Sequence, residues 1–236
     1  MFVKTRDRTE DPEIMDDFDI KGDLLKEALD KIAQINHLLG GNKLTLNGIE
    51  KLLAKAKDHN SITIVDVGCG NGDMLRRLAD FGFQKNLNLE LIGIDANKFT
   101  VDYAAHLSAE YPNITYKCED VFSKSFHELK YDIVLCTLTL HHFKNSEILQ
   151  LVKTFYKNSK LGFVINDLHR NGLAYRLFQV VSFIFRLNDM SRKDGLTSIL
   201  RGFKKKELIA FSENLKFKKY SIDWKWAFRY QWIVEK

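Results

Sequence analysis

The stretch VDVGCGNGD, near residue 70, places glycine at three alternating positions between two acidic side chains, Asp66 and Asp73. The three residues are Gly68, Gly70 and Gly72. Glycine at this density lets a backbone turn tightly and approach a bound ligand closely. The two carboxylates that flank the turn suit a ligand that carries positive charge.

The spacing argues against the two common phosphate-binding turns. The dinucleotide fingerprint G-x-G-x-x-G needs a glycine where this chain has Asp73, and no Lys-Ser/Thr pair follows Gly72, as a P-loop requires. A phosphate at a helix N-terminus also prefers free backbone amides without a competing carboxylate. We therefore expect a cationic ligand that lacks phosphate.

Two further carboxylates follow the turn at the ends of predicted strands. Asp95 ends the second strand, and Asp120 ends the third. A carboxylate at the position of Asp95 can accept hydrogen bonds from both hydroxyls of a ribose. The ordered set of acids therefore indicates a site for a nucleoside-like ligand.

Two adjacent histidines, His141 and His142, follow the fourth predicted strand. Histidine suits general base catalysis at neutral pH, so either side chain is a candidate base. We expect the two side chains to point apart. The alternative is that one caps the next helix while the other packs in the core.

A second polar group follows the fifth predicted strand in the sequence NDLHR. Its candidate residues for orienting a phenol or a carboxylate are Asn166, Asp167, His169 and Arg170. Because ligands of a parallel sheet gather beyond the carboxyl ends of the strands, this group lies on the correct edge. These side chains could equally bind nothing.

Strands that alternate with helices must position these side chains. Helical spacing of apolar residues predicts helices over 22–39, where Gly40-Gly41 ends the first, and over about 47–58. Short β-branched runs predict buried strands that alternate with further helices, which is typical of a parallel α/β sheet. The strands are expected at 61–68, 89–95, 114–120, 131–138 and 161–168, with helices at 73–82, 98–111 and 146–158. After these, a helix at 204–215 precedes two closing antiparallel strands that reverse near Ala227.

The acid followed by G-x-G-x-G resembles motif I of the class I S-adenosylmethionine-dependent methyltransferases. This resemblance implies a Rossmann-like, seven-stranded, mostly parallel sheet with an antiparallel last strand. It also implies S-adenosylmethionine as cofactor and S-adenosylhomocysteine as product, with no metal. The cofactor-binding residues that it implies are Asp66, Gly68, Cys69, Gly70, Gly72, Asp95, Ala96, Asp120, Val121 and Phe122. Of these, Asp120 and Val121 would flank the adenine, while Ala96 and Phe122 would provide apolar walls.

Segments outside the cofactor motif are similar to a bacterial subfamily of small-molecule methyltransferases. Its members are often encoded near type III polyketide synthase or flexirubin-like pigment genes. The segments are QINHLLGG, NDLHRNGLAYRLF and DGLTSILRGFKKKEL. The resemblance implies a hydrophobic phenol- or quinol-like acceptor, methylated on oxygen or on carbon, with His141 or His142 as the base.

Residues 173–187 are apolar on most faces, so protein, a greasy ligand or a membrane surface must cover them. We expect this helix to belong to a cap insertion at about 171–203 in a methyltransferase domain of residues 61–236. Residues 1–60 would form an N-terminal helical lid over the same apolar pocket. The alternative is ordinary core packing or a dimer face, so we expect a monomer or a homodimer.

Charge and cysteine content set limits on location and partners. Residues 151–236 hold 18 lysines and arginines against 7 acidic residues, which could attract RNA, a carrier protein or a membrane surface. Three scattered cysteines predict reduced thiols and a cytoplasmic location. The charged N-terminus does not fit a signal peptide, and no apolar run is long enough to cross a membrane.

Two other functions compete with small-molecule methylation. One is methylation of RNA or protein, drawn by the basic third of the chain. Methylation of exocyclic amines in DNA or RNA is disfavoured, because TLTL occupies positions 137–140 where an Asn/Asp-Pro-Pro-aromatic motif would stand. The other is a module that binds S-adenosylmethionine without turnover.

Overall fold

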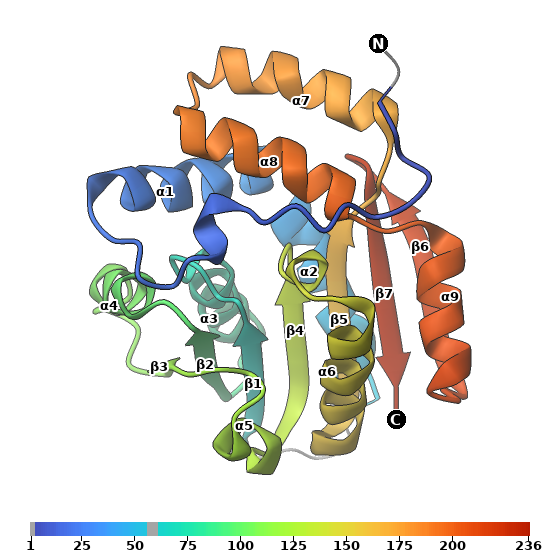
Figure 1. Cartoon of the computed structure of the whole chain (residues 1–236). Coiled ribbons are helices and arrows are strands. Elements are labelled where there is room, and N and C mark those ends of the chain that lie inside the picture. The colour runs from blue at the N-terminus through green and yellow to red at the C-terminus, as the bar shows by residue number, and fades with distance from the viewer. Residues whose placement is uncertain (1–2, 56–60) are drawn as a thin grey trace.

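Seven strands form one sheet in the computed structural model, which describes residues 3–55 and 61–236 (Figure 1). The strand order is β3-β2-β1-β4-β5-β7-β6. The bounds are β1 Ile62–Val67, β2 Leu89–Asp95, β3 Ile114–Cys118, β4 Tyr131–Thr137, β5 Ser159–Leu168, β6 Lys219–Lys225 and β7 Arg229–Glu235. This order places β1 and β4 at the centre, where the chain changes direction across the sheet and ligands of such folds bind.

All strands run parallel except β7, which lies between β5 and β6 and runs antiparallel to both. In this register Leu168 of β5 stands opposite Arg229 of β7. The predicted reversal between the last two strands is confirmed. The fold is therefore the Rossmann-like, mostly parallel sheet with an antiparallel last strand that the sequence indicated.

Helices cover both faces of the sheet because successive strand residues face opposite sides. Ile64 belongs to the core under α2 and α3, whereas its neighbour Val65 belongs to the core under α5, α6 and α9, and both are fully buried. The helices are α1 Asp23–Leu38, α2 Gly41–Leu53, α3 Asp73–Lys85, α4 Lys98–Leu107, α5 Lys124–Glu128, α6 Asn145–Asn158, α7 Gly172–Ile184, α8 Asp189–Arg201 and α9 Lys205–Asn214. Two short 3₁₀ turns, η1 Ile14–Asp16 and η2 Leu140–His142, complete the elements.

The second helix differs from its prediction over 47–58. It begins at Gly41, directly after Gly40, which adopts a left-handed conformation with φ 78°. A side chain at Gly41 would collide with Asn36 and Arg229, so glycine allows α2 to start there. The helix ends at Leu53, and positions 56–58 of the prediction lie outside the described residues.

The upper layer in Figure 1 consists of α1, α7, α8 and the N-terminal segment, which lie over the carboxyl ends of the parallel strands. Helix α2 instead packs on the sheet, where Ile49 and Leu52 join Val164 and Ile233 in one core cluster. The expected lid of residues 1–60 therefore divides into a covering part and a core helix. Among the described residues, no helix is long and apolar enough to cross a membrane.

Candidate active site

The glycine turn after β1 has the geometry that its sequence predicts. Gly68, Gly70 and Gly72 all have positive φ angles, of 69°, 52° and 76°. A Cβ on Gly68 would collide with Thr139, whereas one on Gly70 would meet only Leu29 at 3.8 Å. The turn is thus packed behind Gly68 and open at Gly70, where a ligand can approach the backbone.

Asp66, near the end of β1, is a buried carboxylate whose Oδ1 atom has no hydrogen-bond partner among the described residues. Burial and the nearby charge of Asp95 raise the pKa of Asp66 to about 7. A buried carboxylate without a partner is costly in free energy. A cationic group in the cavity beside Asp66 would relieve this cost, which fits the α-ammonium group of S-adenosylmethionine.

Asp95 is held by backbone donors on either side. Its Oδ2 accepts the N–H of Gly70 at 3.2 Å, and its Oδ1 accepts the N–H of Asn97 at 3.0 Å. Each carboxylate oxygen can accept a second hydrogen bond. Asp95 lines the cavity, and the remaining acceptor positions of its oxygens match the ribose hydroxyls that the sequence leads us to expect there.

The third acid lies at the rim of the same cavity. Asp120 is exposed, and its Oδ1 accepts the N–H of Phe122 at 2.9 Å, which fixes the loop after β3. Val121, Phe122 and Ala96 line the cavity beside it. The adenine-binding residues expected from the sequence therefore lie together and offer apolar walls with one polar edge.

Asp73 is less available to a cationic ligand than its position in the sequence indicated. Its Oδ2 accepts the Nδ2–H of Asn42 at 2.5 Å, which ties α2 to the glycine turn. The carboxylate that remains unpaired beside the turn is Asp66. Cys69 is buried within the turn, and burial raises the pKa of its thiol.

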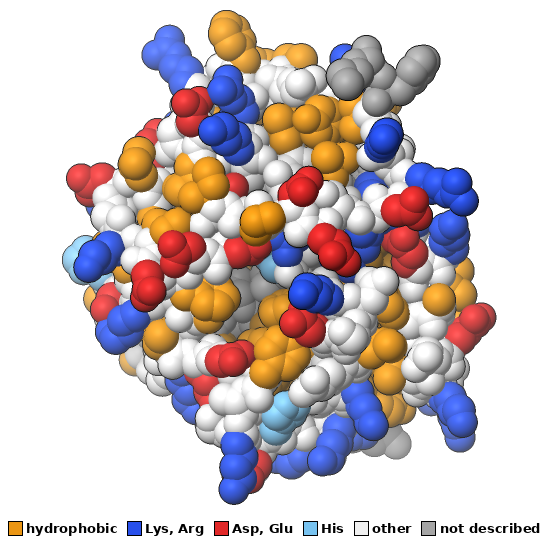
Figure 2. Space-filling view, viewed as in Figure 1, with side chains coloured by type: hydrophobic (Ala, Val, Ile, Leu, Met, Phe, Trp, Pro, Cys, Tyr) orange, Lys and Arg blue, Asp and Glu red, His pale blue; other side chains and the backbone are white. Residues whose placement is uncertain are grey.

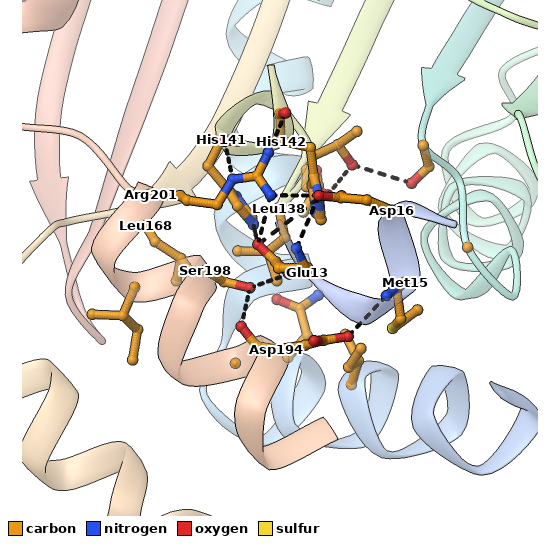
Figure 3. Close-up of a pocket in the computed structure, with 18 of the residues that line it drawn as sticks. Glu13, Met15, Asp16, Leu138, His141, His142, Leu168, Asp194, Ser198 and Arg201 are labelled. Atoms are coloured by element: carbon orange, nitrogen blue, oxygen red, sulfur yellow. Dashed lines mark hydrogen bonds and ion pairs between the residues drawn. The ribbon is translucent and has the colours of Figure 1, made fainter. Parts of the chain in front are cut away.

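The two histidines in η2 stack on one another, so the expectation that they point apart was wrong. Their ring centroids lie 4.4 Å apart with planes 31° from parallel. His141 Nδ1 lies 2.7 Å from Asp167 Oδ1, and His142 Nδ1 lies 2.6 Å from Asp16 Oδ1 (Figure 3). Each histidine is therefore one half of a histidine–carboxylate pair.

The hydrogen bonds of these pairs fix the histidine tautomers. Contacts to His142 and Arg201 hold the pKa of Asp16 well below its usual range, and His141 lowers that of Asp167. Both carboxylates are ionised and can only accept hydrogen bonds. Each neutral histidine therefore donates from Nδ1 and keeps its lone pair on Nε2.

The two rings differ in access to the cavity. The side chain of His141 is 2% exposed, and its Nε2 is buried without a hydrogen-bond partner among the described residues. The side chain of His142 is 26% exposed and lines the cavity. Both rings line the cavity, and the greater exposure of His142 makes it the more accessible of the two to an acceptor.

Asp16 comes from the N-terminal segment, which α8 holds in place. The backbone N–H groups of Ile14 and Met15 donate to Asp194 at 2.7 and 3.0 Å, as Figure 3 shows. Arg201 Nη1 donates to Asp16 Oδ2 at 2.5 Å, and its Nε donates to the carbonyl oxygen of His141 at 3.1 Å. Asp194 and Arg201 therefore lock the segment over η2.

Glu13 lies between the two histidines and α8. Its Oε2 accepts the hydroxyl of Ser198 at 2.6 Å, while its buried Oε1 lies 3.6 Å from His141 Nε2. Burial is the main cause that raises the pKa of Glu13, to about 7. Sequence reasoning missed Glu13 and Asp16, because their partners are more than 120 positions away and neither belongs to a recognisable motif.

Glu13, His141 and His142 present ligand atoms that all lie within 4.8 Å of one another, so they are the group that could hold a metal ion. Arg201 Nη1 lies 3.8 Å from the same Glu13 oxygen. A cation at this distance would repel a divalent metal ion. The arrangement favours proton sharing over metal binding.

In the polar group at the end of β5, some side chains hold the fold together and another lines the cavity. Asn166 is fully buried and donates to Gly41 O and Thr45 Oγ1, both at 3.1 Å, so it anchors α2. Arg170 is fully buried and pairs with Glu207 at 2.6 Å. Of the four candidates Asn166, Asp167, His169 and Arg170, only His169 lines the cavity. Its Nδ1 accepts the indole N–H of Trp224 at 3.2 Å, and burial is the first cause of its lowered pKa.

One cavity of about 1440 Å³ joins these parts. It begins at the glycine turn, passes His142, and continues beneath α7 along Leu177, Phe178 and Val181. The outer face of α7 is also apolar, and Phe183 is 83% exposed. Apolar side chains lie across the upper part of the face in Figure 2, over α7 and α8.

Comparison with known proteins agrees with this geometry. A family model described as a methyltransferase domain matches residues 64–162. The ubiquinone biosynthesis O-methyltransferase of Rickettsia bellii is 27% identical over 139 residues, which are 58% of this chain and 55% of that protein. That of Rickettsia akari is 29% identical over 137 residues, which are 57% of this chain and 51% of that protein. The chain spans about half the length of the curated relatives it matches.

Solved structures share the architecture at low sequence identity. The plantazolicin methyltransferase BpumL in complex with SAH gives a TM-score of 0.67 at 16% identity, covering 89% of this chain and 90% of that one. The magnesium protoporphyrin IX methyltransferase ChlM from Synechocystis PCC 6803 with bound SAM gives 0.53 at 18% identity, covering 86% and 82%. The chain has the fold of these proteins, and its residues 64–162 are similar to the methyltransferase domain model.

Proposed function

We propose that this protein, an S-adenosylmethionine-dependent methyltransferase, transfers a methyl group to the oxygen or a ring carbon of a small, largely apolar phenol or quinol. The observation that carries this proposal is the continuity of one cavity. It joins an unpaired buried acid at Asp66, a histidine–carboxylate pair at His142 and an apolar chamber under α7.

The cofactor end would hold S-adenosylmethionine through four groups of residues. Asp66 would face its ammonium group, Asp95 its ribose hydroxyls, and Asp120 with Val121 its adenine, while the open backbone at Gly70 admits its chain. When bound, the cofactor supplies a methyl carbon activated by a positively charged sulfur. The protein's remaining task is to position an acceptor and make it nucleophilic.

His142 is the base in this proposal. Asp16 accepts the Nδ1–H of His142, so Nε2 carries the lone pair and can take the proton of an acceptor hydroxyl. Loss of that proton makes the oxygen nucleophilic, and it also increases electron density on the conjugated ring carbons. Transfer to oxygen gives an ether, whereas transfer to carbon is completed when the ring carbon loses its own proton.

His141 acts as a positioning residue. Asp167 holds its ring, which stacks against the ring of His142 and limits rotation. The N-terminal segment and α8 exclude water from the buried side of the pair, since Glu13 and Arg201 fill that space. Such enclosure is typical of sites that fix a base in one orientation.

The apolar chamber supports a hydrophobic acceptor over a macromolecular one. The cavity is lined by α7 side chains, and Lys204, Lys205 and Lys206 are not among its lining residues. An acceptor drawn by these lysines would bind outside the cavity, and its binding would weaken steeply with salt. We therefore propose that the basic third of the chain does not select the acceptor.

Calorimetry with S-adenosylmethionine and S-adenosylhomocysteine tests the cofactor end. We expect the wild type to bind both ligands and Asp95→Ala to weaken both, because it loses both ribose acceptors. Asp102→Ala removes an exposed carboxylate on α4 that pairs with Lys98, and it should bind as the wild type does. If the wild type binds neither ligand at millimolar concentration, the proposed function is wrong.

A second assay follows S-adenosylhomocysteine release with 2-hexylphenol and 2-hexylhydroquinone as acceptors. Mass spectrometry of the product separates an ether from a ring-methylated compound. We expect release to depend on the acceptor and to remain in 0.5 M NaCl. Release that requires added RNA or protein, and disappears in that salt, would instead favour a macromolecular acceptor.

A further inference from the structure

Arg229, the first residue of β7, is a buried cation without a direct partner. It is 3% exposed, and its Nε and Nη1 atoms have no hydrogen-bond partner among the described residues. It lines the same cavity as the glycine turn and His142. Arginine is rarely buried this deeply unless an anion pairs with it.

Asp167 is the acid whose charge acts on Arg229, but its two oxygens already accept other hydrogen bonds. Its Oδ1 accepts His141 Nδ1–H and the backbone N–H of Leu168, and its Oδ2 accepts the backbone N–H of His141. Burial lowers the pKa of Arg229 to about 10 in spite of the attraction of Asp167. The guanidinium thus stays charged at neutral pH, and its Nε and Nη1 donors have no partner among the described residues.

A neutral polar atom, Oδ1 of Asn36, lies in the same small space as the guanidinium. A Cβ on Gly41 would lie 1.9 Å from Asn36 Oδ1 and 2.8 Å from Arg229 Nη1, so both atoms face the backbone of Gly41. Asn36 Oδ1 also lacks a hydrogen-bond partner among the described residues. An amide oxygen can accept hydrogen bonds but cannot neutralise the guanidinium.

The sheet order places Arg229 at the acceptor end of the cavity. Asp66 lies on β1, and β4, β5 and β7 follow it across the sheet. Three intervals of about 4.8 Å separate the two residues by about 14 Å along the carboxyl edge. A ligand that reaches Arg229 therefore extends beyond the cofactor and past the histidine pair.

We propose that Arg229 binds a carboxylate on the acceptor, so that the substrate is a phenolic or quinolic acid with an apolar side chain. Guanidinium and carboxylate form two parallel charge-assisted hydrogen bonds, which fix orientation as well as position. The acid group would direct the ring toward His142, while the apolar part lies under α7. This inference rests on the proposed function and specifies its acceptor.

A matched pair of ligands tests the assignment without turnover. The probes are 3-hexyl-4-hydroxybenzoate and 2-hexylphenol, which differ by the carboxylate alone. Binding is measured by calorimetry in saturating S-adenosylhomocysteine, and by the fluorescence of Trp226, which lines the cavity. We expect the wild type to bind the acid at least about 30-fold more tightly, the ratio that about 2 kcal/mol of buried charge pairing gives at 1.4 kcal/mol per tenfold.

Arg229→Gln should abolish this preference and leave the affinity for 2-hexylphenol within about threefold. Arg229→Lys, which keeps the charge but loses the paired geometry, should retain part of it. Because the variant Arg229→Gln removes an unpaired buried charge, we expect it to fold at least as stably as the wild type, which thermal unfolding checks. Arg192→Gln, an exposed arginine on α8 that pairs with Asp189, is the matched control.

Equal affinity of the wild type for both probes, or an unchanged preference in Arg229→Gln, would overturn the inference. The proposed function has a separate failure, since it predicts cofactor binding and methyl transfer to phenols with or without an acid group. A protein that methylates 2-hexylphenol yet ignores the carboxylate keeps the function and loses this inference. A protein that prefers the acid but transfers no methyl group keeps Arg229 as a carboxylate site and loses the proposed function.

Discussion

The two ends of the cavity are built in different ways. At the cofactor end, the glycine turn and Asp95 come from one β-α-β unit, fewer than 30 positions apart in the chain. At the lid end, Asp16 contacts His142 across 126 positions and Arg201 across 185. The first is a local motif on a rigid sheet edge, whereas the second exists only when the chain's N-terminal segment and α8 close over η2.

Each end also buries an acid whose pKa is raised to about 7, but the neighbours differ. Asp66 faces another carboxylate, Asp95, which increases the cost of its charge. Glu13 faces His142 and Arg201, which reduce that cost. The cofactor end therefore needs a cation from outside, while the lid end has its own in Arg201.

The largest effect should come from the histidine that an acceptor can reach. We expect His142→Gln to lower kcat by about 10² to 10⁴, the usual range for loss of a general base. Affinity for S-adenosylmethionine should stay within about threefold, because among the described residues the side chain of His142 is hydrogen-bonded or ion-paired to Asp16 and Glu13 and not to the glycine turn. Single-turnover assays and calorimetry measure the two quantities.

His106→Gln, on the exposed face of α4, is the control for this prediction and should change neither quantity. A large loss of cofactor affinity in His142→Gln would show that the two ends are one coupled site. Unchanged kcat would remove His142 as the base and leave His141, which would then need Glu13 to move away from its Nε2.

Sequence patterns were sufficient to predict the sheet and the glycine turn after its first strand. The strand after residue 60 leads into the glycine turn, and Asp95 follows at the end of the next strand. Local spacing therefore determines their arrangement. The sequence could not reveal that Asn166 is hydrogen-bonded to α2 and that Arg170 is ion-paired with α9. Their partners are far away in the chain and belong to no recognisable motif; they are Gly41, Thr45 and Glu207. For the same reason it could not reveal Glu13, Asp16 or the unpaired state of Arg229.

The next largest effect concerns Glu13 and the stability of the lid. In the folded protein the pKa of Glu13 is about 7, compared with about 4.5 when exposed. The folded state therefore binds this proton more tightly, and its contribution to stability falls as pH rises from about 4.5 to 7. At 1.36 kcal/mol per unit, the loss reaches about 3 kcal/mol at most.

Glu13→Gln keeps the shape of the protonated acid and should lack this loss. Urea unfolding at pH 5 and pH 8 should show that the difference in unfolding free energy between wild type and variant grows at the higher pH. Glu10→Gln, an exposed acid in the same segment, should follow the wild type at both values. A constant difference between wild type and Glu13→Gln would mean that Glu13 is ionised throughout.

At the cofactor end the expected effect is smaller and appears in binding. Asp66→Asn should weaken S-adenosylmethionine about 10-fold to 30-fold, since a charged hydrogen bond contributes about 1.5–2 kcal/mol. Wild-type affinity should fall below pH 7, because protonated Asp66 no longer attracts a cation, and the variant should lose this dependence. Calorimetry at pH 6 and pH 8 measures both affinities. An equal loss of S-adenosylmethionine affinity at pH 6 in the wild type and in Asp66→Asn would contradict this prediction.

The smallest expected effect separates proton sharing from metal binding at the lid end. Dialysis against EDTA should leave kcat within about twofold, because Arg201 occupies the neighbourhood of Glu13 where a divalent ion would need to sit. Zn²⁺ added back should not raise activity above the untreated level. A loss restored by metal would mean that Arg201 moves aside and that Glu13, His141 and His142 bind the ion. The lid end would then also depend on a cation from outside, and its contrast with Asp66 would disappear.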